Sequence, residues 1–372
     1  MLFRSSFLVK GEITEVPDGQ YLALSSYEVA SRLSYMLLGT MPDDALFAAA
    51  AANELSTPEQ IRNQAIRLLQ DPRARARVTS FHEEYMHMGP GTRWADYLRE
   101  VPGFSPDLVP MLSQETDRFF DYIVFEQGGS FRDLLTSPVA FVNASTAGLY
   151  GLDPAPYGTD LVQVSLDAAQ RPGVFTRAGF LASHAVVNRP SPILRGAFLQ
   201  KHVLCTTVGS PPPGAEGTAL PEVSPTASNR ERVDAQTADT ECATCHHAVI
   251  NPTGFTLEGF DALGRYQATD QFSGQPVNTS ASVFMGDAGN VEVNGPAELF
   301  DAIAGSPNAN LCYARAIVQV AYGRGLTSED SCVAEDMATK LTAGGYRILD
   351  LLADLTQAES FRYRAVPTEV AP

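Results

Sequence analysis

The chain has 372 residues, of which 44% are hydrophobic and 19% are charged. This is the composition of a globular protein, and the length exceeds that of a typical single domain. The formal net charge is −17, from 43 acidic and 26 basic residues. Binding to a phosphate backbone needs clustered cations, so the charge argues against nucleic acid as a partner. No run of about 18 apolar residues is present to span a bilayer.

Capping patterns and hydrophobic periodicity predict helices through the first half of the chain. Ser25 with Glu28 forms one capping box and Thr57 with Gln60 forms a second, so each pair marks the start of a helix. Helices are expected over 25–38, 57–69, 72–88, 106–127, 174–185 and 193–204. The remaining stretches predict a short helix with turns over 131–152 and a strand over 161–166.

The second half of the chain begins with a change in composition. Residues 208–228 are rich in Pro, Gly, Ser and Thr, which predicts extended surface chain at a module boundary. A hairpin is expected near Val283 and 291–293, followed by helices over 297–304, 312–322, 329–341 and 346–355. We therefore expect a mainly α protein of three packed helical modules, over 1–137, 138–290 with a Pro/Ser-rich linker at 207–229, and 291–372. The central module is expected to have Gly/Pro-rich loops and at most a short β-hairpin.

The segment Cys242-Ala-Thr-Cys245-His246 matches C-x-x-C-H, the signature of covalent c-type haem attachment. Two thiols one helical turn apart can each form a thioether with a porphyrin vinyl group, and the adjacent imidazole can then face the iron. A redox dithiol, half of a zinc site and a structural disulfide are the alternatives for the two cysteines. No strand precedes Glu241 and no second ligand pair follows at zinc spacing, so we favour one covalent haem c.

Residues elsewhere in the chain are candidates for supporting this haem. The Asn-Pro turn expected at 250–254 offers a backbone carbonyl to the Nδ1 proton of His246, which would leave Nε2 for the iron. An arginine can pair with haem propionates, and Arg195 and Arg265 are the candidates. The sixth iron ligand is left open between a vacant position and three side chains, Met285, His184 and His202. His82 and His87 are expected to be hydrogen-bonded structural histidines.

The three remaining cysteines fit an oxidising compartment. Cys312 and Cys332 lie 20 residues apart at the starts of two predicted helices. A disulfide between them is expected, with a stabilisation of about 3 kcal/mol in the loop-entropy model. Cys205 is then left over, as a buried free thiol or a reactive one.

Several longer motifs resemble a group of exported bacterial cytochrome c-like proteins built from the domains of unknown function 1592, 1588 and 1585. The runs that resemble the first domain are Phe3 to Lys10, Glu28 to Leu38, 41–46 and Asp71-Pro-Arg73. Those that resemble the third domain are 312–324 and 349–364. The second is resembled by the runs 171–176, 191–196, 204–205, 211–213 and 242–266. In that domain Cys242, Cys245 and His246 occupy the haem-attachment positions. Motif positions without an assigned role are occupied by Cys205, Arg195, Glu258, Asp261, Gly264 and Arg265.

The resemblance implies a periplasmic or exported protein, because covalent haem attachment in bacteria normally takes place outside the cytoplasm. The first ten residues have too short an apolar stretch for a secretory signal, so we expect a truncated or misassigned start. A monohaem electron-transfer protein with a redox partner protein is the favoured function. The alternatives are a haem peroxidase or oxidase with an open iron site, and an exported scaffold whose C-x-x-C-H is structural. The sequence does not define the oligomeric state.

Overall fold

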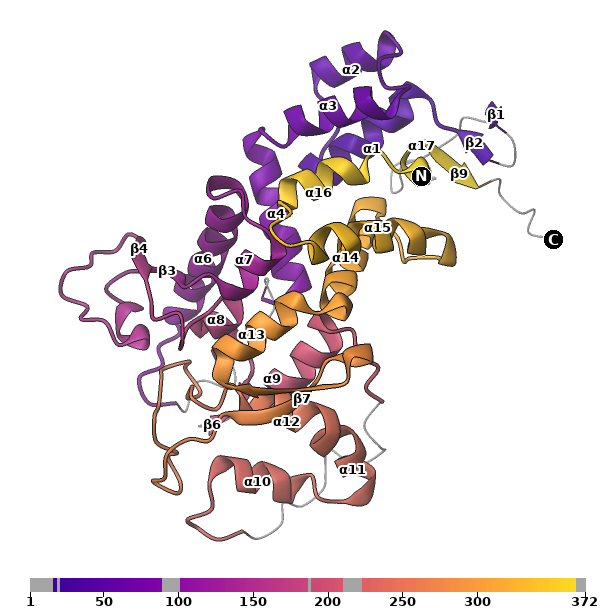
Figure 1. The fold of residues 1–372 in the computed structure, drawn as a ribbon. Helices are drawn as coiled ribbons and strands as arrows, with labels where there is room; N and C mark the ends of the chain where they lie inside the picture. Colours follow the sequence, from indigo (N-terminus) through magenta and orange to yellow (C-terminus); the bar gives the residue numbers. More distant parts are fainter. Residues whose placement is uncertain (1–15, 19–20, 89–100, 187–188, 210–222, 366–372) are drawn as a thin grey trace, which may run out of the picture. The chain divides into compact units, whose positions relative to one another are not determined.

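The computed structural model describes residues 16–18, 21–88, 101–186, 189–209 and 223–365 (Figure 1). Over these residues the fold is mainly helical with short antiparallel sheets, which confirms the predicted fold class. The chain forms two compact units, each assembled from separate stretches. Unit 1 comprises 1–81, 314–340 and 346–372, and unit 2 comprises 82–313 and 341–345. The three successive modules expected along the sequence stay a prediction.

Unit 1 combines the two ends of the chain. Strand β2 (Tyr21–Ala23) pairs on one side with β1 (Val16–Asp18) and on the other with β9 (Tyr363–Ala365), both antiparallel. Its helices are α1 (Ser26–Leu38), α2 (Asp44–Ala51), α3 (Pro58–Leu68), α16 (Ile348–Leu355) and α17 (Glu359–Arg362), with η9 (Ser328–Asp330), most of α4 (Pro72–Tyr85) and α15 (Ser331–Thr342), and the later part of α14 (Pro307–Tyr322).

The predicted capping boxes open α1 and α3. The Ser25 hydroxyl accepts the N–H of Glu28 while the Glu28 carboxylate accepts the N–H of Ser25, and α1 ends at Gly39 with a left-handed φ of 68°. Thr57 and Gln60 form the same reciprocal pair at α3. These ends are set by local chemistry, which is why sequence alone located them.

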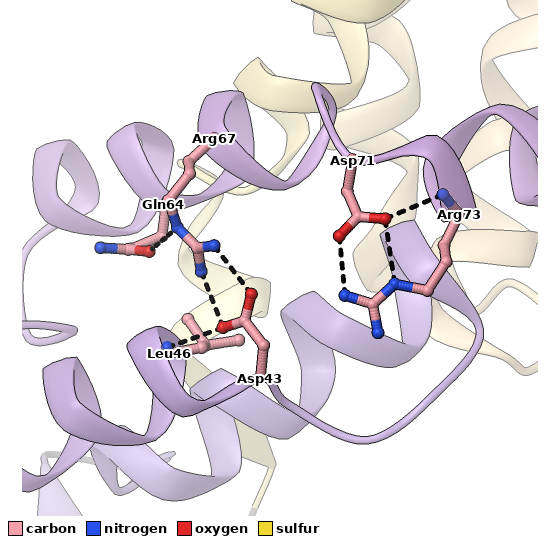
Figure 2. A network of polar contacts seen from close by, with 6 residues as sticks. All are labelled: Asp43, Leu46, Gln64, Arg67, Asp71 and Arg73. Carbon is pink, nitrogen blue, oxygen red and sulfur yellow. Dashed lines mark hydrogen bonds and ion pairs between the residues drawn. The ribbon is translucent and has the colours of Figure 1, made fainter.

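Helix α2 was not predicted, and the side chain that starts it also ties it to α3. Asp43 accepts the N–H of Leu46 at 2.8 Å and receives two hydrogen bonds from Arg67, at 2.8 and 3.0 Å (Figure 2). Gln64 in turn accepts the Nε–H of Arg67 at 2.8 Å. One carboxylate therefore caps α2 and receives a two-pronged hydrogen bond from the last turn of α3.

The Asp71-Pro-Arg73 motif forms a second carboxylate–guanidinium pair at the start of α4. Asp71 accepts hydrogen bonds from the backbone N–H, Nε and Nη2 of Arg73, at 2.7 to 2.9 Å (Figure 2). These bonds lower the pKa of Asp71 to about 2. Because the pair is largely exposed, we assign it to shaping the turn between α3 and α4.

Unit 2 contains the rest of the chain and three two-stranded sheets. β3 (Val139–Val142) pairs with β4 (Val162–Ser165), β5 (Ala185–Val186) with β6 (Arg189–Pro190), and β7 (Ser280–Phe284) with β8 (Asn290–Asn294). The strand expected at 161–166 and the hairpin expected near Val283 are confirmed. The helices are α6 (Leu108–Asp121), α7 (Phe131–Thr136), α8 (Ala178–Ser183), α9 (Pro192–Phe198), α10 (Asn229–Gln236), α11 (Thr240–Cys245), α12 (Asn251–Phe255) and α13 (Gly295–Gly305), with the short turns η2 (Tyr122–Glu126), η3 (Ala147–Tyr150), η4 (Val174–Thr176), η5 (Leu199–Val203), η7 (His246–Ile250) and η8 (Gly286–Ala288).

His82 is a core residue of unit 2. It is fully buried, its Nε2 lies 2.8 Å from the hydroxyl of Tyr313, and its ring stacks on Phe120 with centroids 5.1 Å apart. This confirms the expectation of a hydrogen-bonded structural histidine at this position.

Arg195 lies in the core and binds backbone carbonyls, which corrects its predicted pairing with a haem propionate. Its side chain is fully buried and donates to four backbone carbonyl oxygens at 2.8 to 3.1 Å, those of Leu181, Leu257, Phe260 and Asp261. A guanidinium can satisfy carbonyls that helix ends leave unpaired, and here it joins α9 to the loop after α12. The role of Arg195 is structural.

Helices α9 and α12 cross at unusually short range. A Cβ added at Gly196 would lie 2.0 Å from the carbonyl oxygen of Ile250, and one added at Gly254 would lie 1.9 Å from that of Pro192. The contact therefore needs glycine on both helices. It fixes the segment that begins at His246 against α9.

Among the described residues, no helix combines the length and apolar character needed to cross a membrane.

Candidate functional site

The Cys-x-x-Cys-His segment lies on a nearly continuous helical stretch made of α11, η7 and α12. Asp239 starts α11 by accepting the N–H of Glu241 at 3.0 Å. Cys242 and Cys245 follow one helical turn apart, both partly exposed and both free thiols. His246 is half-buried directly after them, and η7 and α12 pack against α9 and β7. The two thiols are therefore reduced and reachable on one helix.

The partner of His246 differs from the predicted one. Residues 250–254 are helical instead of forming an Asn-Pro turn, because Pro252 occupies the first turn of α12, where it needs no N–H partner. The Nδ1 of His246 lies 3.2 Å from Oδ1 of Asn251, which takes the place of the expected backbone carbonyl. The imidazole is thus anchored by a side-chain amide.

A local widening of the helix brings these two side chains together. Over η7 the backbone N–H of Asn251 donates to the carbonyl of His246, five residues earlier, which is the hydrogen bond of a π turn. In a regular α-helix, side chains five residues apart point about 140° away from each other. The π turn places Asn251 over His246 instead.

The hydrogen bonds of Asn251 define which nitrogen of His246 carries a proton. The Asn251 Nδ2 group donates to Thr237 Oγ1 at 2.9 Å and to Asp234 Oδ1 at 3.3 Å. The amide oxygen then faces His246, so Nδ1 must be the protonated nitrogen and Nε2 keeps its lone pair. Burial lowers the pKa of His246, which favours this neutral form. A neutral imidazole with a free Nε2 is the form that ligates a metal.

Two of the proposed sixth ligands, His184 and His202, lie together around Phe198. Their ring centroids are 4.8 and 5.0 Å from that of Phe198, and His87 lies 4.2 Å from His202. The His184 Nδ1 is 3.0 Å from the carbonyl oxygen of Phe180. Burial lowers the pKa of both His184 and His202 to about 4, so both are neutral at pH 7. Their ligation of iron stays a prediction.

The other two residues proposed to contact the haem are Met285 and Arg265, and their surroundings are as follows. Met285 is 2% exposed just after β7, and its N–H donates to Gly289 at 2.8 Å. Arg265 is partly exposed and its Nε donates to Asp261 at 2.7 Å. Asp261 also accepts the backbone N–H of Arg265 at 2.9 Å, so this carboxylate shapes the loop after α12. The propionate pairing of Arg265 stays a prediction.

The predicted Cys312–Cys332 disulfide is wrong. Cys312 is bonded to Cys205, with Cα atoms 5.5 Å apart, and Cys332 is an exposed free thiol on α15. The first turns of α14 direct Cys312 toward the end of η5, where its Sγ lies 3.3 Å from the carbonyl oxygen of His202. Short separation along the sequence was the wrong guide, because tertiary packing selected a partner 107 residues away.

Sequence reasoning missed the three residues that orient His246, namely Asn251, Thr237 and Asp234. The sequence pattern indicates Asn251 only as part of a turn, and nothing in residues 234–237 distinguishes them from an ordinary helix end. Among the described residues, no group of three or more His, Cys, Asp and Glu side chains is placed to hold a metal ion. The zinc alternative for Cys242 and Cys245 therefore has no further protein ligand there.

Three family models match the chain in succession. Residues 24–152 match the protein of unknown function DUF1592, residues 171–270 match DUF1588 and residues 289–361 match DUF1585. The second match contains the Cys-x-x-Cys-His helix and Asn251. These three families are associated with cytochrome c-like proteins. The chain belongs to the proteins that carry DUF1592, DUF1588 and DUF1585 in this order. Neither the curated proteins nor the solved structures contain a significant match.

Proposed function

We propose that this chain binds one haem c through Cys242 and Cys245, with His246 as an axial ligand, and that it transfers electrons in the bacterial envelope. The observation that carries the proposal is the orientation of His246. Its Nδ1 is hydrogen-bonded to Asn251, which leaves the lone pair of Nε2 for a metal, and two free thiols precede it on the same helical stretch. A purely structural motif has no need of this tautomer.

The chemistry of attachment fits the state of the thiols. Each thioether forms when a thiol S–H adds across a vinyl C=C bond, with the sulfur bonded to one carbon and the hydrogen to the other. The addition consumes no oxidant and requires reduced cysteines, as Cys242 and Cys245 are. The bound haem would supply one-electron chemistry, while this chain anchors it and presents one imidazole.

An oxidising compartment is supported by the disulfide between Cys205 and Cys312. Export to the periplasm, and a redox partner protein there, are therefore parts of the same proposal. The acidic surface implied by the net charge of −17 favours a basic partner.

The test is haem attachment to the full chain, expressed behind a periplasmic signal with the haem-maturation machinery present. After acid–acetone extraction, we expect the wild type to keep a haem whose alkaline pyridine spectrum is that of a thioether-linked group. The double variant Cys242→Ala/Cys245→Ala should lose it, and the control Cys332→Ala should keep it. A colourless wild type that folds normally would refute the proposal and favour the scaffold alternative.

The sixth ligand separates electron transfer from catalysis. We expect one of the variants Met285→Ala, His184→Ala and His202→Ala to convert a low-spin haem spectrum into a high-spin one, whereas His246→Ala should do so by removing the first axial ligand. A high-spin wild type would instead support the alternative of a haem peroxidase or oxidase with an open iron site.

A further inference from the structure

Behind His246, a chain of hydrogen bonds runs from the imidazole to a carboxylate. Asn251 contacts His246 Nδ1 at 3.2 Å on one side, and Thr237 at 2.9 Å and Asp234 at 3.3 Å on the other. Asn251 and Thr237 are 0% and 4% exposed, whereas Asp234 is partly exposed. A carboxylate thus lies two hydrogen bonds away from the ring.

The hydrogen-bond partners of Asn251 define the orientation of its side-chain amide. The Thr237 hydroxyl donates to the carbonyl of Val233 at 2.9 Å and also lies 3.0 Å from Nε2 of His247, and it accepts the hydrogen bond from Asn251 Nδ2. Asp234 likewise accepts as a carboxylate. The NH₂ end of Asn251 must face both, which turns its oxygen to His246. An amide flip would set the oxygen of Asn251 against the carboxylate of Asp234.

We propose that Asn251, oriented by Thr237 and polarised by Asp234, sets the electron-donating strength of His246 and thereby the reduction potential of the bound haem. This inference rests on the proposed haem function. A stronger acceptor at Nδ1 makes the imidazole more electron-rich, which stabilises the oxidised iron and lowers the potential. Asn251 is a neutral acceptor whose strength is increased by the charge on Asp234. All three residues are positioning residues that act through His246.

The first test examines His246 in the full chain prepared without haem, after circular dichroism has shown that it is folded. Two-bond ¹⁵N–¹H correlation spectra distinguish the two imidazole tautomers. We expect the Nδ1–H form in the wild type, and a mixture containing the Nε2–H form in Asn251→Leu and in Thr237→Val. Thr244→Val is the matched control. The Thr244 hydroxyl also donates to the carbonyl four residues earlier, but it takes no part in the hydrogen bonds behind His246. An Nε2–H tautomer in the wild type would overturn the inference.

The second test measures the reduction potential of the haem-loaded full chain. Asn251→Asp should lower the potential relative to the wild type, and Asp234→Asn should raise it. Glu241→Gln is the control for charge alone, since it removes an exposed carboxylate next to Cys242 and leaves the hydrogen bonds of Asn251 unchanged. Equal potentials in all four proteins, or an equal rise in Asp234→Asn and Glu241→Gln, would refute the proposed tuning.

These outcomes separate the two proposals. A chain that attaches no haem contradicts the proposed function, and the tautomer test alone still decides the orientation of His246. A chain that attaches haem but shows the same potential in Asn251→Asp as in the wild type leaves the proposed function intact and contradicts only the tuning.

Discussion

Glu115 is a fully buried carboxyl group on α6, far from solvent. It accepts a hydrogen bond from the hydroxyl of Tyr150 at 2.6 Å, and this hydroxyl in turn accepts the N–H of Ala178. Burial raises the pKa of Glu115 to about 7, although Arg171 and Arg177 act in the opposite direction. The group is therefore protonated in the folded protein over a range where an unfolded chain ionises it.

This shift predicts a stability that falls as pH rises. Below about pH 4.5 the folded and unfolded chains both hold the proton, whereas between there and about pH 7 only the folded chain does. Glu115→Gln removes this dependence. The free energy of unfolding of the variant minus that of the wild type should therefore rise by about 3 kcal/mol across that interval. Urea unfolding at pH 4.5, 6 and 7.5 measures the difference.

The exposed Glu54 provides the control, because Glu54→Gln should show no such gain. A constant difference between Glu115→Gln and the wild type at all three pH values would contradict the assignment of a buried, protonated Glu115.

Single residues were predictable where local chemistry decides their role. The caps at Ser25 and Thr57 and the structural role of His82 follow from neighbours within a turn or from aromatic surroundings. Arg195 and Cys312 were misjudged, because their partners come from elements far away in the sequence. A buried guanidinium that satisfies carbonyls and a surface guanidinium look alike in a sequence.

At the scale of elements, the crossing of α9 and α12 holds the Cys-x-x-Cys-His helix in place. The pairs Gly196 with Ile250 and Gly254 with Pro192 show that the two helices run antiparallel through the contact. Sequence patterns located α9 but gave a turn for α12, since proline is typical of both a turn and the first turn of a helix. The π turn at His246 has no sequence signal comparable to a capping box.

We expect Gly196→Ala and Gly254→Ala each to reduce the free energy of unfolding by about 3 kcal/mol, because a methyl group would overlap a backbone carbonyl. Gly305→Ala is a suitable control, since Gly305 is also helical and has open space at the added Cβ. Chemical denaturation followed by far-ultraviolet circular dichroism compares the three variants. A stability of Gly254→Ala equal to that of Gly305→Ala would show that the close approach is absent in solution.

At the scale of the whole chain, the disulfide joins segments that the sequence gives no reason to connect. Cys205 follows η5 and Cys312 lies on α14, with a sequence separation of 107. The three family models indicate the order of the domains, but unit 1 combines stretches from both ends of the chain, and unit 2 includes residues 341–345 beside 82–313. Discontinuous packing of this kind depends on tertiary contacts, which hydrophobic periodicity does not record.

The double variant Cys205→Ser/Cys312→Ser should be less stable than the wild type by about 5 kcal/mol in the loop-entropy model. Cys332→Ser should be neutral, because this thiol is exposed and unpaired. Urea unfolding of the full-length proteins measures both, and peptide mapping under non-reducing conditions identifies the bonded pair directly. A peptide that links Cys312 to Cys332 would contradict the structure.

Together with the proposed haem attachment, the position of this disulfide implies that haem attachment precedes disulfide formation. Along the chain the order is Cys205, Cys242, Cys245 and Cys312, so both thiols proposed to attach haem lie between the two disulfide partners. During synthesis and the proposed export from the N-terminus, Cys205 would meet both of these thiols before Cys312 has emerged. Early oxidation would join Cys205 to the wrong cysteine and block attachment. On the proposed function, haem attachment ahead of oxidation would remove these competitors and leave Cys312 as the partner of Cys205 within the same unit.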